Sequence, residues 1–515
     1  MMVSLFLIIF ANSLFVVCFM MKVIGLFLLA LVLGLRLNAQ SPQTYMVSDF
    51  AEDELESVLD LCGKGGIEQV LYKSPFSSYG HYEWDPAFAS KGDRSVARMV
   101  QKAQEAGVKL GLLIHEDAIS LNDSYFEPRY FKQLRKTGPV HFYSNITAEQ
   151  RDLVIYHTEE LDQPSTLNLI LVGNEMLSYG TMEPAGDMLF LHRCSRGIHG
   201  TKNVEHEKRE EAYKIWDSPE RYCAPEGALL DSVRNRLVQR IVAAGSPFTM
   251  LNGGYGQDLV NTSQRVQLVE RWSYHDGSQP PMLGWIPVRV SDKRQASSTL
   301  EDLEWVLSKA AAFNAGFGLV IDRIALKRYG QLDKVMALVK AWNAVRDAGV
   351  LTEYQKEDLR DPYADWHLEP YGEEGYLLFP VHQSRGYRCV IHEVGPHRET
   401  WQWKSDETSV VGLRIEVKGK GEIRQPMLAT ASDTLVFPCV VKVGEFLLCD
   451  FDGVARVTDA DYHTLQEFPL ERMLTLSEGE SSVFFSCDVE GDKKLPEVSV
   501  RYFTREEPTL LRMNR

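Results

Sequence analysis

Between about residues 44 and 350, amphipathic segments that end at a glycine alternate with short apolar runs, and this pattern constrains the fold most. The segments 93–106, 229–244 and 332–348 predict helices, because apolar residues recur on one face and a glycine follows each. The runs that predict strands are Thr44–Val47, Gln69–Tyr72, Lys109–His115, Phe248–Asn252, Met282–Val288 and Gly318–Asp322. This alternation predicts an α/β fold, a (β/α)8-type TIM barrel over residues 40–350. No G-x-G-x-x-G opens these helices, which disfavours a dinucleotide-binding fold.

Two stretches depart from the alternation. Between about 140 and 200, short apolar strands joined by polar turns predict a β-rich insertion on the barrel rim. After a charged linker at 351–366, closely spaced short strands with Gly and Asp turns predict an antiparallel β-sandwich over 367–515. Its aromatic residues Tyr387, Trp401 and Trp403 are expected to pack its core, with stacking on sugar rings as the alternative.

Residues 1–39 read as a signal peptide. Two apolar stretches flank Lys22, and a start at Met21 gives an apolar region over Val23–Leu35 and a small-residue cleavage site at Ala39. A membrane anchor is the alternative, because the doubled stretch is long enough to span a bilayer. We therefore expect a secreted or periplasmic protein with no stable membrane partner after signal cleavage.

The net charge and the cysteine content indicate which classes of partner and metal the chain is expected to bind. The net charge of −16 becomes −18 without residues 1–39, which disfavours nucleic acid and anionic membranes, so a polysaccharide substrate is the expected partner. The seven cysteines beyond that segment include no C-x-x-C pair, and the spacing of His192, His199 and His206 is no ligand pattern. No metal and no cofactor are predicted.

Polar residues that follow the apolar runs are the candidates for chemistry, because catalytic groups of parallel barrels lie at the carboxyl ends of strands. The candidate catalytic residues are His81, Tyr82, His115, Arg193 and Arg196. The candidate substrate-binding residues are Glu116, Glu175, His199, His206, Asn252, Asp258 and Asp322. Three have structural alternatives, since Asp322 also suits a helix cap, Glu175 a position on a half-buried strand, and Arg196 with Gly197 a tight turn.

Three sets of motifs carry a family resemblance. They are Tyr79-Gly80-His81-Tyr82 with Asn122-Asp123-Ser124-Tyr125, Val172-Gly173-Asn174-Glu175 with Arg193-Cys194-Ser195-Arg196-Gly197, and Glu304-Trp305-Val306-Leu307. Together, over roughly residues 45–370, the chain resembles secreted bacterial barrel proteins related to the glycosaminoglycan lyases of polysaccharide lyase family 29. The resemblance implies a uronic-acid polysaccharide as substrate. The chain departs from the family after Phe248–Leu251, where Asn252-Gly253-Gly254 stands in place of an acidic Asp-Gly.

The leading hypothesis is β-elimination on a uronate-containing chain. A lyase must abstract a proton beside a carboxylate and stabilise the charge that develops. His115 or His81 would be the base, Tyr82 the proton donor, and Arg193 or Arg196 the carboxylate clamp, because a guanidinium binds both oxygens of a carboxylate.

Two alternatives stay open. A glycoside hydrolase would use paired carboxylates from the set Glu116, Glu175, Asp258 and Asp322. The second alternative is a non-catalytic glycan-binding protein on a degenerate barrel. It is suggested by Asn252, which stands where an acid is expected.

Overall fold

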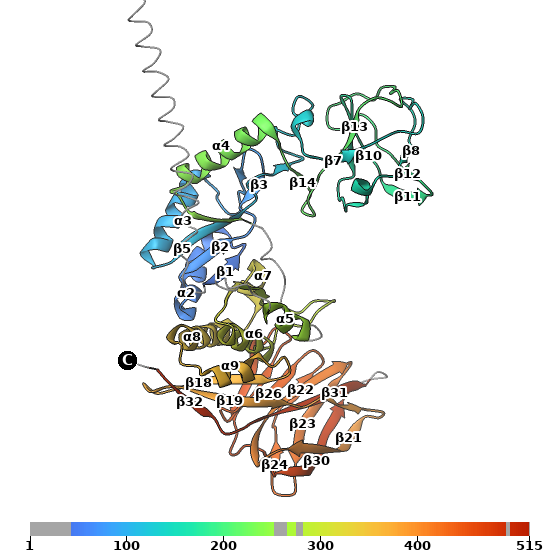
Figure 1. The fold of residues 1–515 in the computed structure, drawn as a ribbon. Helices are drawn as coiled ribbons and strands as arrows, with labels where there is room; N and C mark the ends of the chain where they lie inside the picture. The colour runs from blue at the N-terminus through green and yellow to red at the C-terminus, as the bar shows by residue number, and fades with distance from the viewer. Residues whose placement is uncertain (1–42, 252–264, 274–281, 491–494, 514–515) are drawn as a thin grey trace, which may run out of the picture.

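The chain folds into three parts. We describe them from a computed structural model that covers residues 43–251, 265–273, 282–490 and 495–513. A parallel sheet with helices on one side lies in the middle, and an insertion and a β-sandwich lie at its opposite ends (Figure 1). The segment 1–39 lies outside the described residues. Among the residues that are described, no helix is long and apolar enough to cross a membrane.

The central sheet has six parallel strands in the order β15-β5-β2-β1-β17-β16. Their bounds are β1 (Thr44–Ser48), β2 (Gln69–Tyr72), β5 (Lys109–Ile114), β15 (Phe248–Leu251), β16 (Met282–Pro287) and β17 (Gly316–Val320). All six runs predicted from the sequence are confirmed as strands. The first strand pairs with the last, which is the cyclic order of a barrel.

The expectation of eight strands is not confirmed. The described residues contribute six strands to this sheet, and within them β15 and β16 do not pair. The insertion leaves no gap in the sheet, because β15 pairs directly with β5, and the chain that joins β15 to β16 lies partly outside the described residues. The α/β class is confirmed, and a closed eight-stranded barrel is not.

Helices cover the outer face of this sheet. Their bounds are α2 (Leu55–Gly65), α3 (Asp93–Glu105), α4 (Gly227–Ala243), α5 (Arg265–Ser273), α6 (Leu300–Ala312), α7 (Arg323–Arg328), α8 (Leu332–Ala348) and α9 (Glu353–Arg360). Gly66 and Gly349 end α2 and α8 in the left-handed conformation, which glycine adopts without steric cost. The helix faces and the outer face of the sheet form one large apolar core.

Short elements fill the loops around the sheet. They are η1 (Glu52–Glu54), β3 (Phe76–Ser78), β4 (Glu83–Trp84), β6 (Ile119–Ser120), η2 (Phe131–Gln133) and β14 (Tyr222–Cys223). The pairing of β6 with β14 ties the loop after β5 to the segment before α4. This pairing brings distant parts of the chain to the carboxyl end of β5.

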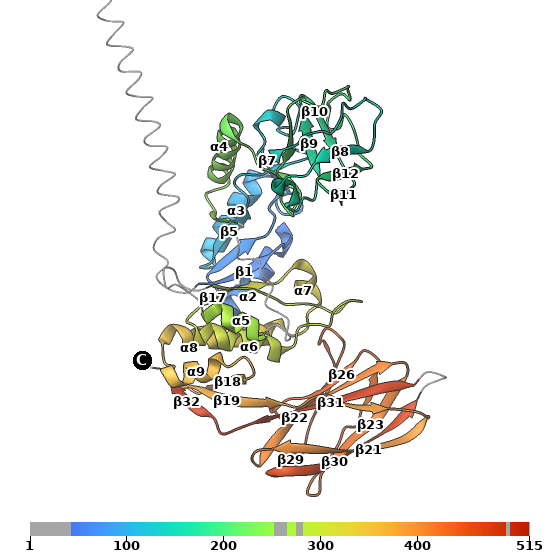
Figure 2. The ribbon, with the colours of Figure 1, turned by 45° about the vertical axis from the view of Figure 1, so that its right-hand side comes forward.

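The insertion is a small all-β unit with its own core. Its strands are β7 (Lys136–Pro139), β8 (Leu153–Tyr156), β9 (Leu169–Val172), β10 (Glu175–Ser178), β11 (Thr181–Ala185), β12 (Met188–His192) and β13 (Ala212–Ile215), with η3 (Glu159–Asp162). They form the antiparallel sheets β10-β9-β13-β7 and β11-β12-β8. A separate apolar cluster holds them together, and Figure 2 shows the unit projecting from the end of the central sheet away from the sandwich.

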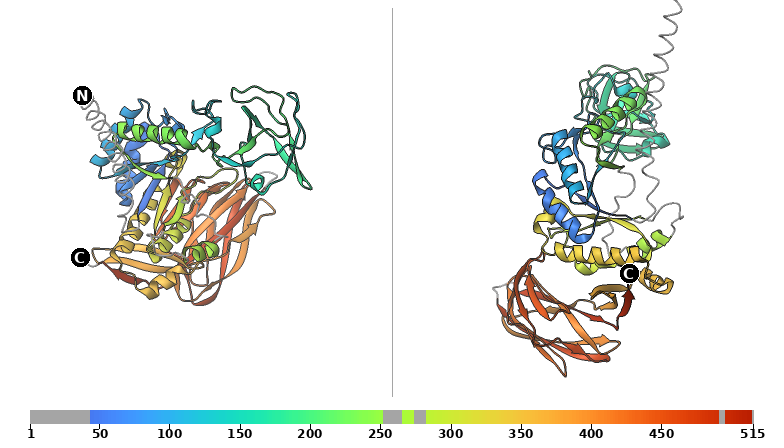
Figure 3. Two further views of the ribbon diagram at one scale, coloured as in Figure 1. Left: turned by 45° about the horizontal axis from the view of Figure 1, so that its top comes forward. Right: turned by 90° about the vertical axis from the view of Figure 1, so that its left-hand side faces the viewer.

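The C-terminal sandwich has two antiparallel sheets (Figure 3). One contains β18 (Asp365–Tyr371), β19 (Gly375–Gln383), β20 (Tyr387–Val390), β22 (Ser409–Gly419), β26 (Phe446–Cys449), β27 (Val454–Thr458), β28 (Thr464–Pro469), β29 (Thr475–Leu476), β31 (Pro496–Arg505) and β32 (Thr509–Arg512). The other contains β21 (Gly395–Ser405), β23 (Glu422–Ala429), β24 (Thr434–Val436), β25 (Val440–Lys442) and β30 (Gly479–Glu490). Trp403 is fully buried between the sheets, so it packs the core and does not stack on a sugar.

The sandwich and the helices share an interface. Leu368, Phe446 and Tyr462 of the sandwich belong to the same apolar core as the helices. Asp461 of the sandwich accepts hydrogen bonds from the amide of Ser291 (2.7 Å) and the hydroxyl of Ser297 (2.7 Å). The two parts are therefore joined by a packed and hydrogen-bonded surface.

Candidate active site

Polar side chains lie at the carboxyl ends of the strands, on the inner face of the parallel sheet. A small apolar cluster marks that face, with members Tyr45, Val47, Leu71, Leu113 and Trp285, and Val320 packs against it. Side chains alternate along a strand, so the residue two positions further points the same way. In this way Val47, Leu71, Leu113 and Val320 lead to Asp49, Lys73, His115 and Asp322, which we call the inner rim. The strand order places these four on neighbouring strands.

The contacts of the inner rim agree with this placement. The Lys73 ammonium lies 5.8 Å from the ring centroid of Trp285, a member of the inner cluster. One Asp49 oxygen accepts a hydrogen bond from the backbone amide of Arg323 (2.7 Å). One Asp322 oxygen accepts a hydrogen bond from the backbone amide of Ala325 (2.7 Å). Both carboxylates therefore lie at the start of α7.

His115 lies among tyrosines. Its Nδ1 is 2.8 Å from the Tyr222 hydroxyl, and its ring centroid is 4.6 Å from that of Tyr222 and 5.3 Å from that of Tyr79. Burial lowers the pKa of His115, and the carboxylate of Glu220 opposes this only in part. The imidazole is therefore neutral at pH 7, as a general base must be.

His81 is held by a buried carboxylate on a loop beside the inner rim. Its Nδ1 lies 2.7 Å from Asp123, whose side chain is 1% exposed, and its ring stacks on Tyr125 at 4.0 Å. Gly80 makes this possible, because a Cβ there would lie 2.6 Å from the Asp123 carboxylate. Since Tyr79 contacts the His115 ring, both predicted histidines belong to one neighbourhood.

Tyr82 does not fit the proton-donor role predicted for it. Its side chain is fully buried, and its hydroxyl donates to the carbonyl oxygens of His115 (2.9 Å) and Glu116 (2.7 Å). Burial raises the pKa of this phenol. Tyr82 therefore fixes the backbone after β5 and does not reach a substrate.

Arg196, Glu175 and His206 form a buried network inside the insertion. Arg196 Nε and Nη2 donate to Glu175 at 2.7 and 3.0 Å, and His206 Nε2 lies 2.8 Å from the same carboxylate. The side chains of Arg196 and Glu175 are 0% exposed. The predicted carboxylate clamp and two predicted substrate contacts are thus structural, because their hydrogen-bonding groups are used within the insertion.

The other candidates on the insertion divide. Arg193 is exposed at the end of β12, where its amide donates to Asp152 (3.1 Å), and it does not join the inner rim. His199 lies nearer, because its ring packs edge-on against Phe126 at 4.9 Å, in the loop that carries Asp123. Burial lowers the pKa of His199.

The remaining predicted residues also fall into two groups. Asp322 caps α7, as its structural alternative proposed, and it belongs to the inner rim as well. Glu116 follows His115 and is half-buried, while its neighbour Asp117 is bound by Arg234 at 2.9 Å. Asn252 and Asp258 lie outside the described residues.

The sequence reasoning missed several members of this site. Lys73 directly follows a predicted strand and Asp49 follows one after a single residue, so their position was a usable signal. Asp123 was noticed as part of a motif but was not given a role. Tyr222 had no local signal, because it lies 107 residues from His115 and reaches it through the pairing of β6 with β14.

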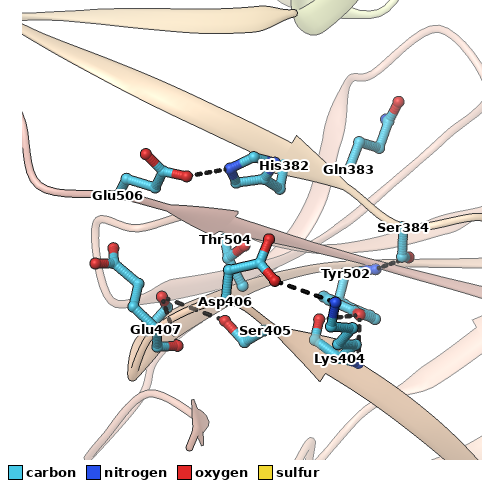
Figure 4. Close-up of a pocket in the computed structure, with 11 residues that line it drawn as sticks. His382, Gln383, Ser384, Lys404, Ser405, Asp406, Glu407, Tyr502, Thr504 and Glu506 are labelled. Carbon is cyan, nitrogen blue, oxygen red and sulfur yellow. Dashed lines mark hydrogen bonds and ion pairs between the residues drawn. The ribbon is translucent and has the colours of Figure 1, made fainter. Parts of the chain in front are cut away.

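Two cavities lie away from the inner rim. One, of about 140 Å³, is a polar pocket on the sandwich, where His382 pairs with Glu506 and Lys404 pairs with Asp406 (Figure 4). The other, of about 360 Å³, lies between α6, α8 and the sandwich. Neither is lined by residues of the inner rim.

No family model and no curated protein matches the chain. Solved structures align with it weakly. An alpha-galactosidase from Lactobacillus brevis is 10% identical with a TM-score of 0.34, over 89% of this chain and 56% of that one. A GH36 alpha-galactosidase from Geobacillus stearothermophilus is 12% identical with a TM-score of 0.29, over 88% and 56%. An alpha-amylase from Anoxybacillus is 9% identical with a TM-score of 0.29, over 88% and 99%.

The chain spans about 56% of the length of the two galactosidases. The three proteins are named as galactosidases and an amylase, none as a polysaccharide lyase. Similarities this weak assign neither an activity nor a substrate to the chain. The resemblance to polysaccharide lyase family 29 stays a prediction.

Proposed function

We propose that the chain is an exported carbohydrate-active enzyme that cleaves a glycan at the inner rim. The observation that carries the proposal is the arrangement of Asp49, Lys73, His115 and Asp322 on four neighbouring parallel strands, at the end where barrel enzymes hold their catalytic groups. Tyr79 and Tyr222 stand beside His115 and offer aromatic faces for a sugar ring.

Hydrolysis is the reaction that these residues support best. A glycoside hydrolase uses two carboxyl groups, one to protonate the leaving oxygen and one to attack the sugar or activate water. Val47 and Val320 are paired between β1 and β17, and Asp49 and Asp322 lie two positions after them. Both carboxylates also accept hydrogen bonds from backbone amides at the start of α7. They are therefore the proposed pair.

The charge of this region favours a neutral glycan over a uronic-acid chain. Arg193 and Arg196, the clamp that elimination requires, lie on the insertion. The charged group that acts on the pKa of His115 is the carboxylate of Glu220, and the inner rim adds Asp49 and Asp322 against the one cation Lys73. A polyanion approaching these groups is repelled.

The test is to incubate the purified protein with neutral and uronic-acid polysaccharides and to follow reducing ends together with absorbance of the C4–C5 double bond. We expect reducing ends from a neutral polymer without new absorbance. Asp49→Asn and Asp322→Asn should each lower the rate by roughly 10²–10⁴-fold. Asparagine also caps helices, so the second change preserves the start of α7.

Asp53→Asn is the matched control, because Asp53 is an exposed acid in the neighbouring turn η1. This variant should retain the full rate. Unchanged cleavage by both Asp49→Asn and Asp322→Asn would refute the proposed pair.

Elimination is the second candidate, and the contact between His115 and Tyr222 favours it. A neutral imidazole 2.8 Å from a phenol provides a base and a proton donor in one place. Under this hypothesis, cleavage produces the double-bond absorbance and His115→Ala abolishes it. Cleavage by His115→Ala at the wild-type rate would exclude the histidine as the base.

A further inference from the structure

Strand β21 turns a histidine and a glutamate toward the inside of the sandwich. Along this strand the residues 395, 397, 399, 401 and 403 are less exposed than the residues between them, so they face inward. Trp401 and Trp403 at two of these positions pack with the core. His397 and Glu399 occupy positions where the same alternation calls for apolar side chains.

A fully buried cysteine meets this pair. One ligand atom each from Cys389, His397 and Glu399 lies within 4.8 Å of the others. Within the described part of the chain, His397 Nε2 is buried and has no hydrogen-bond partner, and it is 3.9 Å from the nearest Glu399 oxygen. A buried nitrogen without a partner is costly unless something else binds it.

A second cysteine lies beside the cluster. Cys487 is the residue directly opposite His397 in the ladder between β21 and β30. Residues directly opposite each other in an antiparallel ladder lie on the same face of the sheet, so Cys487 faces the inside of the sandwich as His397 does. The cluster therefore joins β20 of one sheet to β21 and β30 of the other.

We propose that Cys389, His397 and Glu399 bind a divalent zinc ion, with Cys487 as the candidate fourth ligand. Thiolate, imidazole and carboxylate are the ligands that zinc takes, at about 2.3, 2.0 and 2.1 Å. In a tetrahedral site these lengths place ligand atoms about 3.4–3.8 Å apart, so the ligand atoms of Cys389, His397 and Glu399, which lie within 4.8 Å of one another, must draw together by up to about 1 Å to hold an ion. Glu399 is partly exposed and gives the ion access from solvent.

The predicted role of this ion is structural. With Cys487 as the fourth ligand the protein fills all four positions, which leaves none open for a substrate. Each thiol releases its proton to solvent as its sulfur binds zinc, and no oxidation takes place. The ion would link the two sheets at the edge of the sandwich, far in sequence from the inner rim, so the inference does not depend on the proposed function.

Sequence spacing could not reveal this site. Motif searches for zinc depend on closely spaced pairs such as C-x-x-C, and here the ligands come from three strands. The sequence-based expectation of no metal rested on that spacing alone.

The test uses the full chain, stripped with a chelator and titrated with zinc in competition with a chromogenic chelator. We expect one ion per chain, and cobalt in place of zinc should give the charge-transfer absorption of thiolate ligands. Cys389→Ser and His397→Gln should each weaken binding by more than about 100-fold, since even a second-shell partner is worth roughly 10–100-fold. Zinc should raise the melting temperature of the wild type but not that of His397→Gln.

Cys439→Ser is the matched control, because Cys439 is a buried thiol of the same core outside the cluster. It should bind zinc as the wild type does. His397 is only partly buried, so its variant keeps the test valid if Cys389→Ser fails to fold. Equal zinc affinity in His397→Gln and the wild type would overturn the proposal, and so would a mass spectrum showing a disulfide between Cys389 and Cys487.

Discussion

Replacing Arg196 with alanine should loosen the insertion and leave the inner rim intact. The change removes the two guanidinium bonds to Glu175 (2.7 and 3.0 Å) and the bonds to the carbonyls of Thr147 (2.8 Å) and Val204 (2.7 Å). Glu175 is then a fully buried carboxylate without its cation. Removing one partner of such a pair costs about 3–5 kcal/mol.

Hydrogen exchange measured by mass spectrometry reports this loss of stability separately for each segment of the chain. We expect peptides from residues 134–217 to exchange roughly 100- to 4000-fold faster in Arg196→Ala, because each 1.4 kcal/mol is a factor of ten. Peptides of the central sheet should exchange as in the wild type. Arg193→Ala, an exposed arginine of the same loop, is the control and should change stability by less than about 0.5 kcal/mol. Wild-type exchange in Arg196→Ala together with lost glycan cleavage would refute the reasoning.

Three further predictions concern pH and the domain interface. Burial lowers the pKa of His367, but Glu304 at 2.8 Å outweighs it and the pKa rises from 6.5 to about 9. The protonated His367 therefore adds ~3 kcal/mol to the free energy of unfolding below pH 6.5, and this contribution is lost as the pH rises through 9. In Glu304→Gln, the free energy of unfolding measured with urea should depend less on pH over that range. Asp461→Asn should cost about 1–3 kcal/mol by calorimetry, because it weakens charge-assisted hydrogen bonds between the sandwich and the loop that joins β16 to α6. In NMR, His115 should titrate below 6.5, and a midpoint above 6.5 would contradict its burial.

Local patterns carried the secondary structure. Amphipathic spacing followed by glycine located α3, α4 and α8, because helix faces and glycine caps are set by residues close in sequence. The number of strands in the central sheet was not set locally. It depends on which distant segments pair, as β5 and β15 do although the insertion separates them in sequence.

The site could be predicted only in part, because residue type does not reveal which way a side chain faces. His115 and Asp322 follow strands of the central sheet, and their position in the sequence was enough to predict that. Arg196 and Glu175 have the chemistry of a substrate clamp, but they bind each other inside the insertion. Tyr222 comes to His115 through strand pairing between distant segments, which no local pattern records.

The continuous core beneath the sandwich has a consequence for how this gene can be cut and recombined. A fragment ending at residue 366 would leave an apolar flank of α6 and α8 bare to water, since Leu368, Phe446 and Tyr462 complete the core there. The insertion has its own cluster, and its first and last strands, β7 and β13, pair with each other at its base. Exchange between homologous genes therefore has a permissible joint at the base of the insertion and a costly one between α9 and the sandwich.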